Sequence, residues 1–504
     1  MDDRLGQAYD EFLHLTREIY YLAATGGILE WDQQVMMPAK AAPLRAAQTA
    51  TLTGIIHDRM TSPRLKELLD RLEASRDALA ADAQVNSREM RRVTDRARKI
   101  PRQLAQEIAH TQALAQACWV EARQKSDFPL FAPWLEKMLA LRRQEADAIG
   151  YQESRYDALL DEYEPHATAR EIEAVFTRLC PPIVELVREI AESGIQPKCT
   201  LLTRSFPVEH QREFGLWAIR RLGFDLGAGR VDVSAHPMTT GNLTDVRLTT
   251  RYNENYFAGA FFGLIHEAGH GMYEQGFDER HQGTPRATAA SLGIHESQSR
   301  MWENLVGRSL AFWKYAFPYL QAFFPESTQD IALEDWYAAV NDVRPSPIRV
   351  EADEVTYNLH IVLRFEIEKD LVEERLKVAD LPALWNTKMK EYLGAVPAND
   401  AQGVLQDIHW SLGLVGYFPT YTLGNLYAAQ LFHTVEREFP DLQQRFEGGD
   451  FLTLKRWLNG KIHSPGQTHR AAELVRQVTG EAPDARFLVE HLRAKFRPLY
   501  GVSS

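Results

Sequence analysis

Apolar residues in the first half of the chain recur every three or four positions, the spacing that places side chains on one face of an α-helix. Residues 64–100 contain neither glycine nor proline. Four leucines in this segment share one helical stripe: Leu65, Leu68, Leu69 and Leu72. The same pattern predicts helices over residues 102–128 and 169–193, so nearly all of the first 225 residues should be helical. Prolines mark the expected helix boundaries: Pro101, Pro129 and Pro133.

The pattern changes between residues 227 and 252, where apolar and polar residues alternate as they do in a β-strand. The alternating apolar positions lie in two short runs: Val231, Val233, Val246 and Leu248. A Gly-Asn pair at residues 241–242 is a turn signal between them. We therefore expect a short β-ribbon, too small to be a domain, whose edge can pair with an extended peptide beside a cleft.

Helical patterning resumes after Tyr252 and continues to about residue 500, with breaks at residues 344–347 and 403–424. Aromatic residues at helical spacing precede the chemical motif described below, and core packing is the expected function for all of them: Tyr256, Phe257, Phe261 and Phe262.

We find no fixed-period repeat, low-complexity tract or long linker, which favours a single unit over several separate domains. The expected fold is mainly α and comprises residues 1–504. It is divisible into a helical lobe, residues 1–226, and a catalytic lobe, residues 227–504, that carries the ribbon.

Composition places the chain among ordinary globular proteins, with 45% apolar and 25% charged residues. Its 57 basic and 69 acidic residues give a net charge of −12, which repels a phosphate backbone and argues against nucleic acid as a partner. Three cysteines form no CxxC pair, which favours free thiols and a cytoplasmic location: Cys118, Cys180 and Cys199.

The amino terminus starts with acidic residues and lacks the basic start and apolar run of an export signal. The longest apolar stretch, residues 256–265, is far shorter than the roughly 20 residues that cross a bilayer. We therefore expect no membrane partner.

The strongest chemical signal is the sequence HEAGH at residues 266–270, within the apolar helical segment 253–275. Residues four apart on a helix are separated by about 6 Å along the axis and about 40° around it, so both imidazoles can bind one metal ion. Glu267 can reach a water on that ion without being a ligand, which suits a general base. Gly276 is the expected C-terminal stop of the helix.

A catalytic zinc site needs a third protein ligand besides His266 and His270. Glu296, 26 residues after His270 (296 − 270), lies on a second predicted helix and is the best candidate. His295 is the alternative, but neighbouring helix residues point about 100° apart, so only one of the two can face the ion. Such a ligand set leaves the fourth position of zinc open for water, which predicts hydrolysis of peptides. Cobalt or manganese are the expected substitutes for zinc.

Five motifs in order resemble those of the carboxypeptidase Taq family of zinc metallocarboxypeptidases. They are DVRLT at 245–249, HEAGH with the following YEQG at 273–276, HESQ at 295–298, IRVEAD at 348–353 and GVLQDIHW at 403–410. The resemblance spans nearly the whole chain, beginning at Trp31-Asp32. Met238 and residues 242–244 are less typical, which concerns only the shape of a loop. The resemblance implies a large helical metallopeptidase fold with a deep groove, assembled as a saddle-shaped homodimer.

The activity that the resemblance implies is removal of single residues from the carboxyl ends of peptides, with broad specificity. Arginine is the residue best suited to a terminal carboxylate, because its planar fork binds both oxygens and keeps its charge. By similarity Arg349 is that residue, helped by the phenol of Tyr421, with Tyr417 as the less favoured alternative. The residues alone do not distinguish it from other arginines: Arg247, Arg300 and Arg344.

Asp407 and His409 occupy alternate positions in the last of these motifs. They can hold the second ring nitrogen of a zinc ligand or donate to the developing oxyanion, and a plain hydrogen-bonded loop pair is equally open. Arg247, on the ribbon, is expected to orient this network, and we count both Arg247 and His409 among the substrate-binding residues.

Two other functions share parts of this pattern. A zinc endo-oligopeptidase of the same helical, deep-cleft type has the same metal core and differs only in the groups that bind a terminal carboxylate. A catalytically silent peptide-binding protein would keep the fold but would have no need for Glu267.

Overall fold

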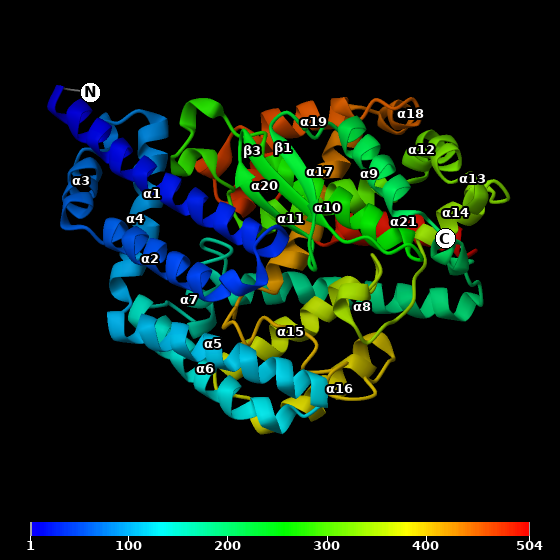
Figure 1. Ribbon diagram of the computed structural model, residues 1–504, viewed down its shortest axis with the longest axis horizontal. Helices are drawn as coiled ribbons and strands as arrows, with labels where there is room; N and C mark the ends of the chain where they lie inside the picture. Colours follow the sequence, from blue (N-terminus) through cyan, green and yellow to red (C-terminus); the bar gives the residue numbers. More distant parts are fainter. Residues whose placement is uncertain (1–2, 503–504) are drawn as a thin grey trace.

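The computed structural model describes residues 3–502, and the first half of the chain is almost entirely helical, as predicted (Figure 1). Its helices are α1 (Asp3–Val35), α2 (Ala42–Met60), α3 (Pro63–Ala74), α4 (Ala81–Lys99), α5 (Arg102–Lys125), α6 (Phe128–Ile149), α7 (Arg155–Leu160), α8 (Ala169–Ser193) and α9 (Val208–Leu222). Among the described residues, no helix has the length and apolar character required to cross a bilayer.

The single helix predicted over residues 64–100 is wrong, because the chain folds back near Ser75 and forms α3 and α4 instead. The leucine stripe of α3 packs with Phe12 of α1 and with Ala83 and Met90 of α4 in one small core. A continuous rod could not bring both of its ends onto α1. Tertiary packing therefore overrides a sequence that has no helix-breaking residue.

Prolines mark helix ends less strictly than predicted. Pro129 lies in the first turn of α6, where its missing N–H has no helical partner to lose. Pro133, predicted to be a boundary, lies inside the same helix. α8 has the predicted limits, and its start is fixed by a capping box in which Thr168 and Glu171 exchange hydrogen bonds.

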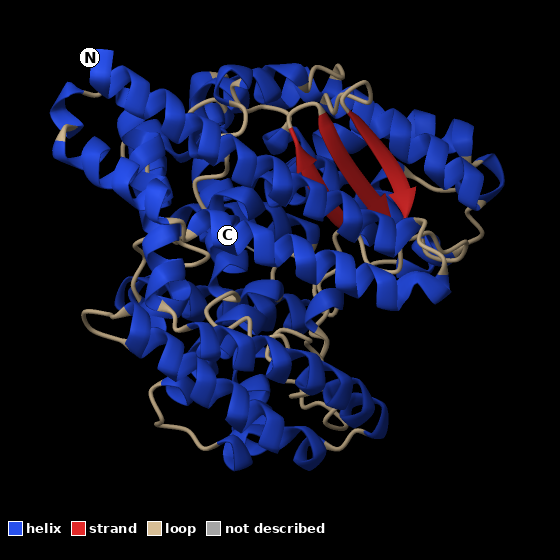
Figure 2. Ribbon diagram, turned by 60° about the vertical axis from the view of Figure 1, so that its left-hand side comes forward, coloured by secondary structure: helices blue, strands red, loops and turns tan. Residues whose placement is uncertain are grey.

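The predicted ribbon is a sheet of three strands, β1 (Gly229–Val233), β2 (Met238–Asn242) and β3 (Asp245–Thr250) (Figure 2). The central strand β3 pairs in parallel with β1 and antiparallel with β2. β2 was not predicted, because its sequence MTTGN shows no apolar alternation. A short turn after Asn242 joins β2 to β3. Only glycine fits at position 241, because its φ is positive (99°) and a Cβ there would lie 1.8 Å from the carbonyl oxygen of Asp245.

Helices also dominate the second half of the chain. They are α10 (Phe257–Glu274), α11 (Leu292–Arg300), α12 (Leu310–Phe323), α13 (Pro325–Thr328), α14 (Leu333–Val340), α15 (Tyr357–Val372), α16 (Leu381–Leu393), α17 (Pro419–Glu438), α18 (Leu442–Glu447), α19 (Leu452–Leu458), α20 (Ala471–Thr479) and α21 (Arg486–Leu499). Gly424, predicted to lie in a break, is inside α17.

α10 is the central helix of the molecule and packs against β2, β3, α9 and α11. Phe257, Phe261 and Phe262 are buried in the core as predicted, whereas Tyr256 is 48% exposed and the prediction for it is wrong. The helix ends at Glu274 close to the predicted stop, but Gly276 does not adopt a left-handed conformation. A Cβ at Gly276 would lie 2.3 Å from Nδ1 of His463, so close packing accounts for the glycine.

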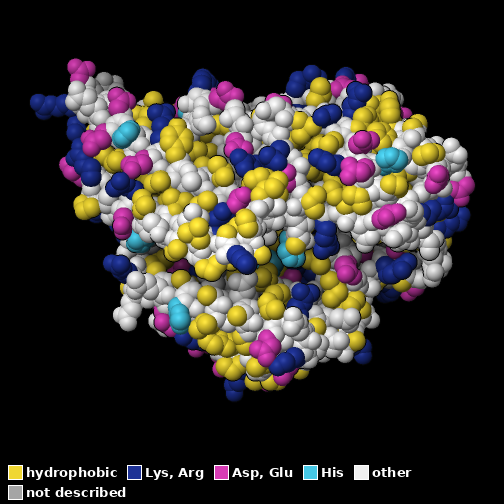
Figure 3. All heavy atoms as spheres, in the orientation of Figure 1, with side chains coloured by type: hydrophobic (Ala, Val, Ile, Leu, Met, Phe, Trp, Pro, Cys, Tyr) yellow, Lys and Arg dark blue, Asp and Glu magenta, His cyan; other side chains and the backbone are white. Residues whose placement is uncertain are grey.

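The helices form two bodies with a hollow between them. In the lower part of Figure 1, α15 and α16 from the second half of the chain pack with α6 and α8 from the first half. Figure 3 shows the surface hollowed along the line between this part and the part that contains the sheet. One large hydrophobic core includes residues from both halves of the chain. The division at residues 226 and 227 stays a prediction, and packing between helices crosses it.

Candidate metal centre

Two helices bring the predicted metal ligands together. α10 carries His266 and His270 one turn apart, and α11 places Glu296 opposite them. Oε2 of Glu296 lies 3.8 Å from Nε2 of His266 and 3.4 Å from Nε2 of His270. The three ligand atoms lie within 4.8 Å of one another, and no other group of three such residues within 3–502 could hold an ion.

Two glycines hold α11 close to its neighbours. A Cβ at Gly269 of α10 would lie 2.6 Å from the Cα of Ser299 in α11. A Cβ at Gly424 of α17 would lie 2.6 Å from Cγ of Glu296. Only glycine allows both approaches, because a side chain in either place would force the helices apart. The position of the Glu296 carboxylate therefore depends on contacts of α11 with both α10 and α17.

We expect Gly424→Ala to displace Glu296 and to weaken metal binding about tenfold or more, as changes behind a metal ligand do. Helix propensity alone predicts that this substitution stabilises the protein, because alanine favours a helix relative to glycine. Gly54→Ala in α2 is the matched control, since nothing lies within 4 Å of a Cβ there. Competition with a chromogenic chelator measures both affinities. Equal affinities in the two variants would show that the contact has no effect on the site.

The second ring nitrogen of His266 contacts Glu303. Nδ1 of His266 lies 3.0 Å from Oε2 of Glu303, and because a carboxylate can only accept, Nδ1 donates and Nε2 keeps a free lone pair. Glu303 lies in a π-helical segment, residues 301–307, that continues α11. Arg300 and Arg308 each donate to its carboxylate at 3.3 Å. This acidic partner therefore fixes the tautomer and the orientation of His266.

His270 is supported by its own hydrogen-bonded partners. Its Nδ1 lies 2.6 Å from Nδ1 of His295 and 3.1 Å from the backbone oxygen of His295. Nε2 of His295 donates to Oε1 of Glu274 at 2.8 Å, which leaves Nδ1 of His295 as an acceptor for the His270 proton. His295, the alternative third ligand, therefore lies behind His270, and the free nitrogen of His270 faces Glu296.

The charged neighbours of Glu296 keep its buried carboxylate ionised. Burial opposes the charge of Glu296, but Arg300 and His266 hold the pKa of its carboxyl group well below the usual range. Burial lowers the pKa of His270 to about 3. Burial opposes the charge of His266 as well, but Glu296 and Glu303 raise its pKa. The group thus combines an ionised carboxylate with imidazoles whose free nitrogens face it, a donor set suited to a divalent cation.

Glu267, the predicted base, lies on α10 between the two histidines and is 7% exposed. Its Oε2 accepts a hydrogen bond of 2.6 Å from Oγ1 of Thr239 on β2. Burial raises the pKa of its carboxyl group. A carboxylate with a raised pKa beside a metal ligand can take and return a proton near neutral pH.

Arg349 is 7% exposed and lies in a buried cluster with Asp407, Arg364 and Tyr357. Nε and Nη2 of Arg349 are each 2.9 Å from Oδ1 of Asp407, and Nη1 donates to the Tyr357 hydroxyl at 3.0 Å. Oδ2 of Asp407 accepts from Nε of Arg364 at 2.7 Å. Burial opposes the charge of Asp407, but the two arginines hold its pKa far below the usual range. Two guanidinium groups beside one carboxylate leave a net positive charge.

The predicted tyrosine and histidine lie beside this cluster. The guanidinium carbon of Arg349 is 5.1 Å from the centre of the Tyr421 ring, and Nε2 of His409 is 3.2 Å from the Tyr421 hydroxyl. Burial lowers the pKa of His409 to about 3. Tyr421 precedes Gly424 by one turn of α17, so the helix that contacts Glu296 also carries Tyr421. The Tyr417 ring packs 5.4 Å from that of Tyr421.

One contact that the sequence left open and one that we expected do not occur. Asp407 contacts arginines and not a ring nitrogen of His266 or His270, because Glu303 and His295 occupy those nitrogens. Arg247 was expected to orient Asp407 and His409. It pairs instead with Asp245 at 2.9 Å and stacks 4.5 Å from the centre of the Trp31 ring. The β3 strand that carries it places it against α1, at the outer face of the sheet.

Several residues of the site were missed from the sequence. Two of them lie on α11 or directly after it, at spacings of four and seven from Glu296: Glu303, and Arg300, which was considered only as a rival arginine for the substrate carboxylate. Helical spacing from a candidate ligand was the available signal for these positions. Thr239 and Arg364 have no such signal, because each contacts a site residue that is distant from it along the chain. Thr239 contacts Glu267, and Arg364 contacts Asp407.

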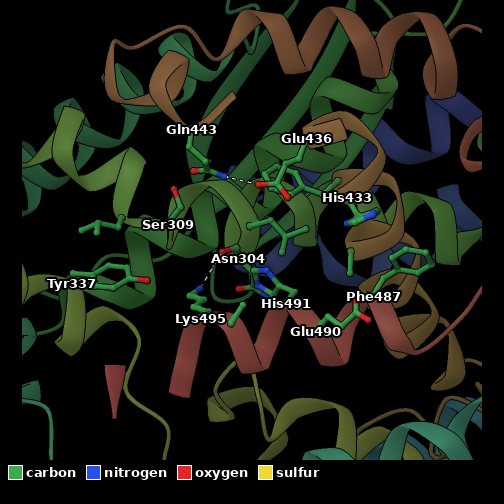
Figure 4. Close-up of a pocket in the computed structure, with 15 residues that line it drawn as sticks. Asn304, Ser309, Tyr337, His433, Glu436, Gln443, Phe487, Glu490, His491 and Lys495 are labelled. Atoms are coloured by element: carbon green, nitrogen blue, oxygen red, sulfur yellow. Dashed lines mark hydrogen bonds between the residues drawn. The ribbon is translucent and has the colours of Figure 1, made fainter. Parts of the chain in front are cut away.

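A separate pocket of about 400 Å³ lies between α17, α21 and the segment 301–307 (Figure 4). Lys495 and His491 on its wall both pair with the buried carboxylate of Glu354. Nζ of Lys495 also donates to the backbone oxygen of Asn304 at 3.3 Å. Among the described residues that line this pocket, none is a candidate metal ligand. The pocket is therefore distinct from the metal centre.

The chain is similar to known metallocarboxypeptidases over nearly its whole length. A family model described as carboxypeptidase Taq (M32) metallopeptidase matches residues 11–496. Thermostable carboxypeptidase 1 of Thermus thermophilus is 47% identical over 98% of this chain and 99% of that protein. Carboxypeptidase 1 of Bacillus subtilis is 40% identical over 97% of this chain and 98% of that protein. The crystal structure of an M32 carboxypeptidase from Deinococcus radiodurans matches with a TM-score of 0.96 and 36% identity, over 98% of this chain and all of that one (100%).

Proposed function

Because the chain belongs to the carboxypeptidase Taq (M32) family of metallopeptidases, and is therefore a metallocarboxypeptidase, we propose that it removes single residues from peptide carboxyl ends with a zinc ion. The observation that carries this proposal is the convergence of His266, His270 and Glu296 beside a buried, positively charged arginine cluster. Contacts through Arg300 and Tyr357 link the two groups. Hydrolysis and carboxylate recognition are thereby available in one site.

The donor set fits a divalent ion held by His266, His270 and Glu296. Both histidines keep their Nε2 lone pairs free, because each Nδ1 has a hydrogen-bond partner. Two imidazoles and a carboxylate are typical of catalytic zinc, and cobalt or manganese can take the same donors. A bound zinc ion supplies polarisation of the scissile carbonyl and a lowered pKa for a water molecule.

Glu267 performs the proton transfers in this proposal. Its carboxylate takes the proton of the attacking water and passes it to the nitrogen of the departing residue. The Thr239 hydroxyl fixes one carboxylate oxygen at 2.6 Å, so the other oxygen is left to face the water. Broad specificity follows if the protein binds the terminal carboxylate and the scissile carbonyl and does not select the side chain.

Arg349 binds the terminal carboxylate in this proposal. Arginine has five N–H donors, and those on Nε, Nη1 and Nη2 that contact Asp407 and Tyr357 leave one N–H on each Nη group. These two can bind both oxygens of a substrate carboxylate. The other proposed substrate-binding residues are Tyr421, His409 and Arg247. Tyr421 and His409 lie beside Arg349, whereas Arg247 lies against Trp31.

The proposal is tested with a peptide offered as a free acid and as its carboxyl-terminal amide. We expect stepwise release of single residues from the free acid and at least 100-fold slower cleavage of the amide, because the amide lacks the charge that Arg349 binds. Mass spectra of both digests measure the products and their rates. Equal cleavage of the two peptides would favour the endo-oligopeptidase, and no cleavage of either would favour a silent peptide-binding protein.

We also propose a homodimer in the cytoplasm. The resemblance to the family supports the dimer. α2 offers a surface for it, because none of its residues is buried and two large apolar side chains are exposed, Leu44 by 62% and Ile55 by 42%. None of the three cysteines is paired in a disulfide, which supports a reducing compartment.

A further inference from the structure

Tyr357 contacts both halves of the proposed active site. It is the first residue of α15 and is 5% exposed. Its hydroxyl accepts a hydrogen bond of 3.0 Å from Nη1 of Arg349. Arg300 lies on the face of the Tyr357 ring, with its guanidinium carbon 4.3 Å from the ring centre. One side chain thus touches the carboxylate-binding arginine and an arginine of the metal centre.

Arg300 continues this line of contacts to the metal centre. Its Nε donates to Oε1 of Glu296 at 2.7 Å, and its Nη1 donates to Glu303 at 3.3 Å. Glu296 is a candidate ligand, and Glu303 orients His266. The Tyr357 ring therefore supports the arginine that holds two carboxylates of the metal centre in place.

The same helix supports Arg349 a second time. Arg364 lies seven residues after Tyr357, two turns along α15 on the same face. It donates to Asp407, which in turn accepts from Arg349. α15 therefore holds Arg349 from two sides, directly through Tyr357 and indirectly through Asp407.

A carboxypeptidase has to fix the distance between the terminal carboxylate and the scissile carbonyl. Each residue of an extended chain adds roughly 3.5 Å, so a shift of Arg349 by that length would place a different peptide bond at the metal. Tyr421 does not fix this distance through a hydrogen bond to Arg349, because its hydroxyl faces His409 and only its ring faces the guanidinium. Tyr357 contacts Arg349 and Arg300 with two separate parts of one rigid side chain.

We propose that Tyr357 is a positioning and specificity-determining residue that sets the spacing between Arg349 and Glu296 to one substrate residue. This inference rests on the proposed carboxypeptidase activity. The hydroxyl positions the carboxylate-binding arginine, and the ring positions the arginine beside the ligand Glu296. The two functions can be separated by substitution.

Tyr357→Phe removes only the hydroxyl. We expect KM for free-acid peptides to rise about tenfold or more, the effect of losing a hydrogen bond to a charged group, while kcat changes less than threefold. The metal content should be unchanged, because the ring under Arg300 remains. Tyr392→Phe is the matched control, since its hydroxyl also contacts a charged partner, Glu366 at 2.9 Å, and neither residue belongs to the metal centre or to the arginine cluster. Wild-type KM in Tyr357→Phe would overturn the proposal.

Tyr357→Leu removes the hydroxyl and the ring. We expect it to raise KM like the phenylalanine variant and in addition to weaken zinc binding about tenfold, measured by chelator competition without substrate. Tyr392→Leu controls for loss of a tyrosine ring, here a partly buried one that packs against the main core. Zinc affinity equal to that of Tyr357→Phe would overturn the function assigned to the ring, and if the leucine variant does not fold, the phenylalanine variant still tests the hydroxyl.

The wild-type protein tests the proposed activity, and the variants test the inference about Tyr357. If the wild-type protein cleaved amides as fast as free acids, the carboxypeptidase proposal would fail before any variant was compared. If the wild type required the free acid and Tyr357→Phe kept its KM, only the inference about Tyr357 would fail.

Discussion

Glu267→Gln is expected to lower kcat/KM roughly 10³-fold while the protein still binds its metal ion. Glutamine has nearly the same shape and can still contact Thr239, but it cannot accept the proton of the attacking water. His266, His270 and Glu296 are untouched, so metal affinity should stay close to that of the wild type. Steady-state assays with a free-acid peptide and metal analysis of the same preparation measure both quantities.

Glu366→Gln is the matched control for this substitution, because Glu366 lies on α15 and pairs with Lys388 and Tyr392 away from the metal centre. Its activity should equal that of the wild type. Near wild-type turnover in Glu267→Gln would refute the assignment of the base, and loss of the metal ion would mean that the glutamate acts on the site in another way.

Arg349→Ala should have the second largest effect. Truncating one partner of a buried, hydrogen-bonded charge pair typically costs 2–5 kcal/mol, so about 3 kcal/mol, or roughly 100-fold in kcat/KM for free-acid peptides, is expected. The amide, which does not use this contact, should be cleaved at its slow wild-type rate. The preference for the free acid over the amide should therefore fall by about the same factor, measured on the two peptides with one preparation.

Arg344→Ala is the control for loss of an arginine close by in the sequence, because the Arg344 side chain is exposed and contacts Asp342 and the Cys199 thiol. It should retain the wild-type preference. An Arg349→Ala protein that kept the preference while losing zinc would mean that the arginine serves the metal centre and not the substrate carboxylate.

The convergence of the two candidate histidine ligands could be predicted because local geometry alone determines their relation. His266 and His270 are four residues apart on one helix, and this spacing makes both imidazoles leave the same face whatever the rest of the fold does. Glu296 was accessible for a similar reason, because a short helix allows only one of two neighbours to face the ion. The angle between neighbouring helix residues shows only that one of Glu296 and His295 can face the ion, and the choice of Glu296 came from its position 26 residues after His270, a distance usual for a carboxylate third ligand.

The residues that support the ligands could not be predicted in the same way. Thr239 reaches Glu267 from a strand whose sequence shows no strand pattern, and its place depends on pairing with β3. Asp407 was considered as a partner for a metal-ligating histidine, yet it contacts Arg349 and Arg364, because α15 and the loop before α17 meet only in the folded chain. Sequence spacing carries no information about such contacts.

Helix limits, too, could be predicted from the sequence where local signals fix them and not where tertiary packing does. α8 could be predicted with its limits, because a capping box and a uniform apolar stripe specify it locally. The break between α3 and α4 has no local signal and follows from packing of both helices on α1. Gly424 looked like part of a loop, but it lies in α17 where that helix touches Glu296. The reason for this glycine is a contact between helices that are far apart in the sequence.

The central claim is that one metal ion is held between α10 and α11 by two imidazoles and one carboxylate. X-ray absorption of the zinc-loaded protein, with the metal content measured per chain, tests it most directly. The account predicts one zinc ion per chain, nitrogen and oxygen ligands near 2.0–2.1 Å, and the signature of two imidazole rings. A sulfur ligand, a single imidazole or no bound zinc would contradict it.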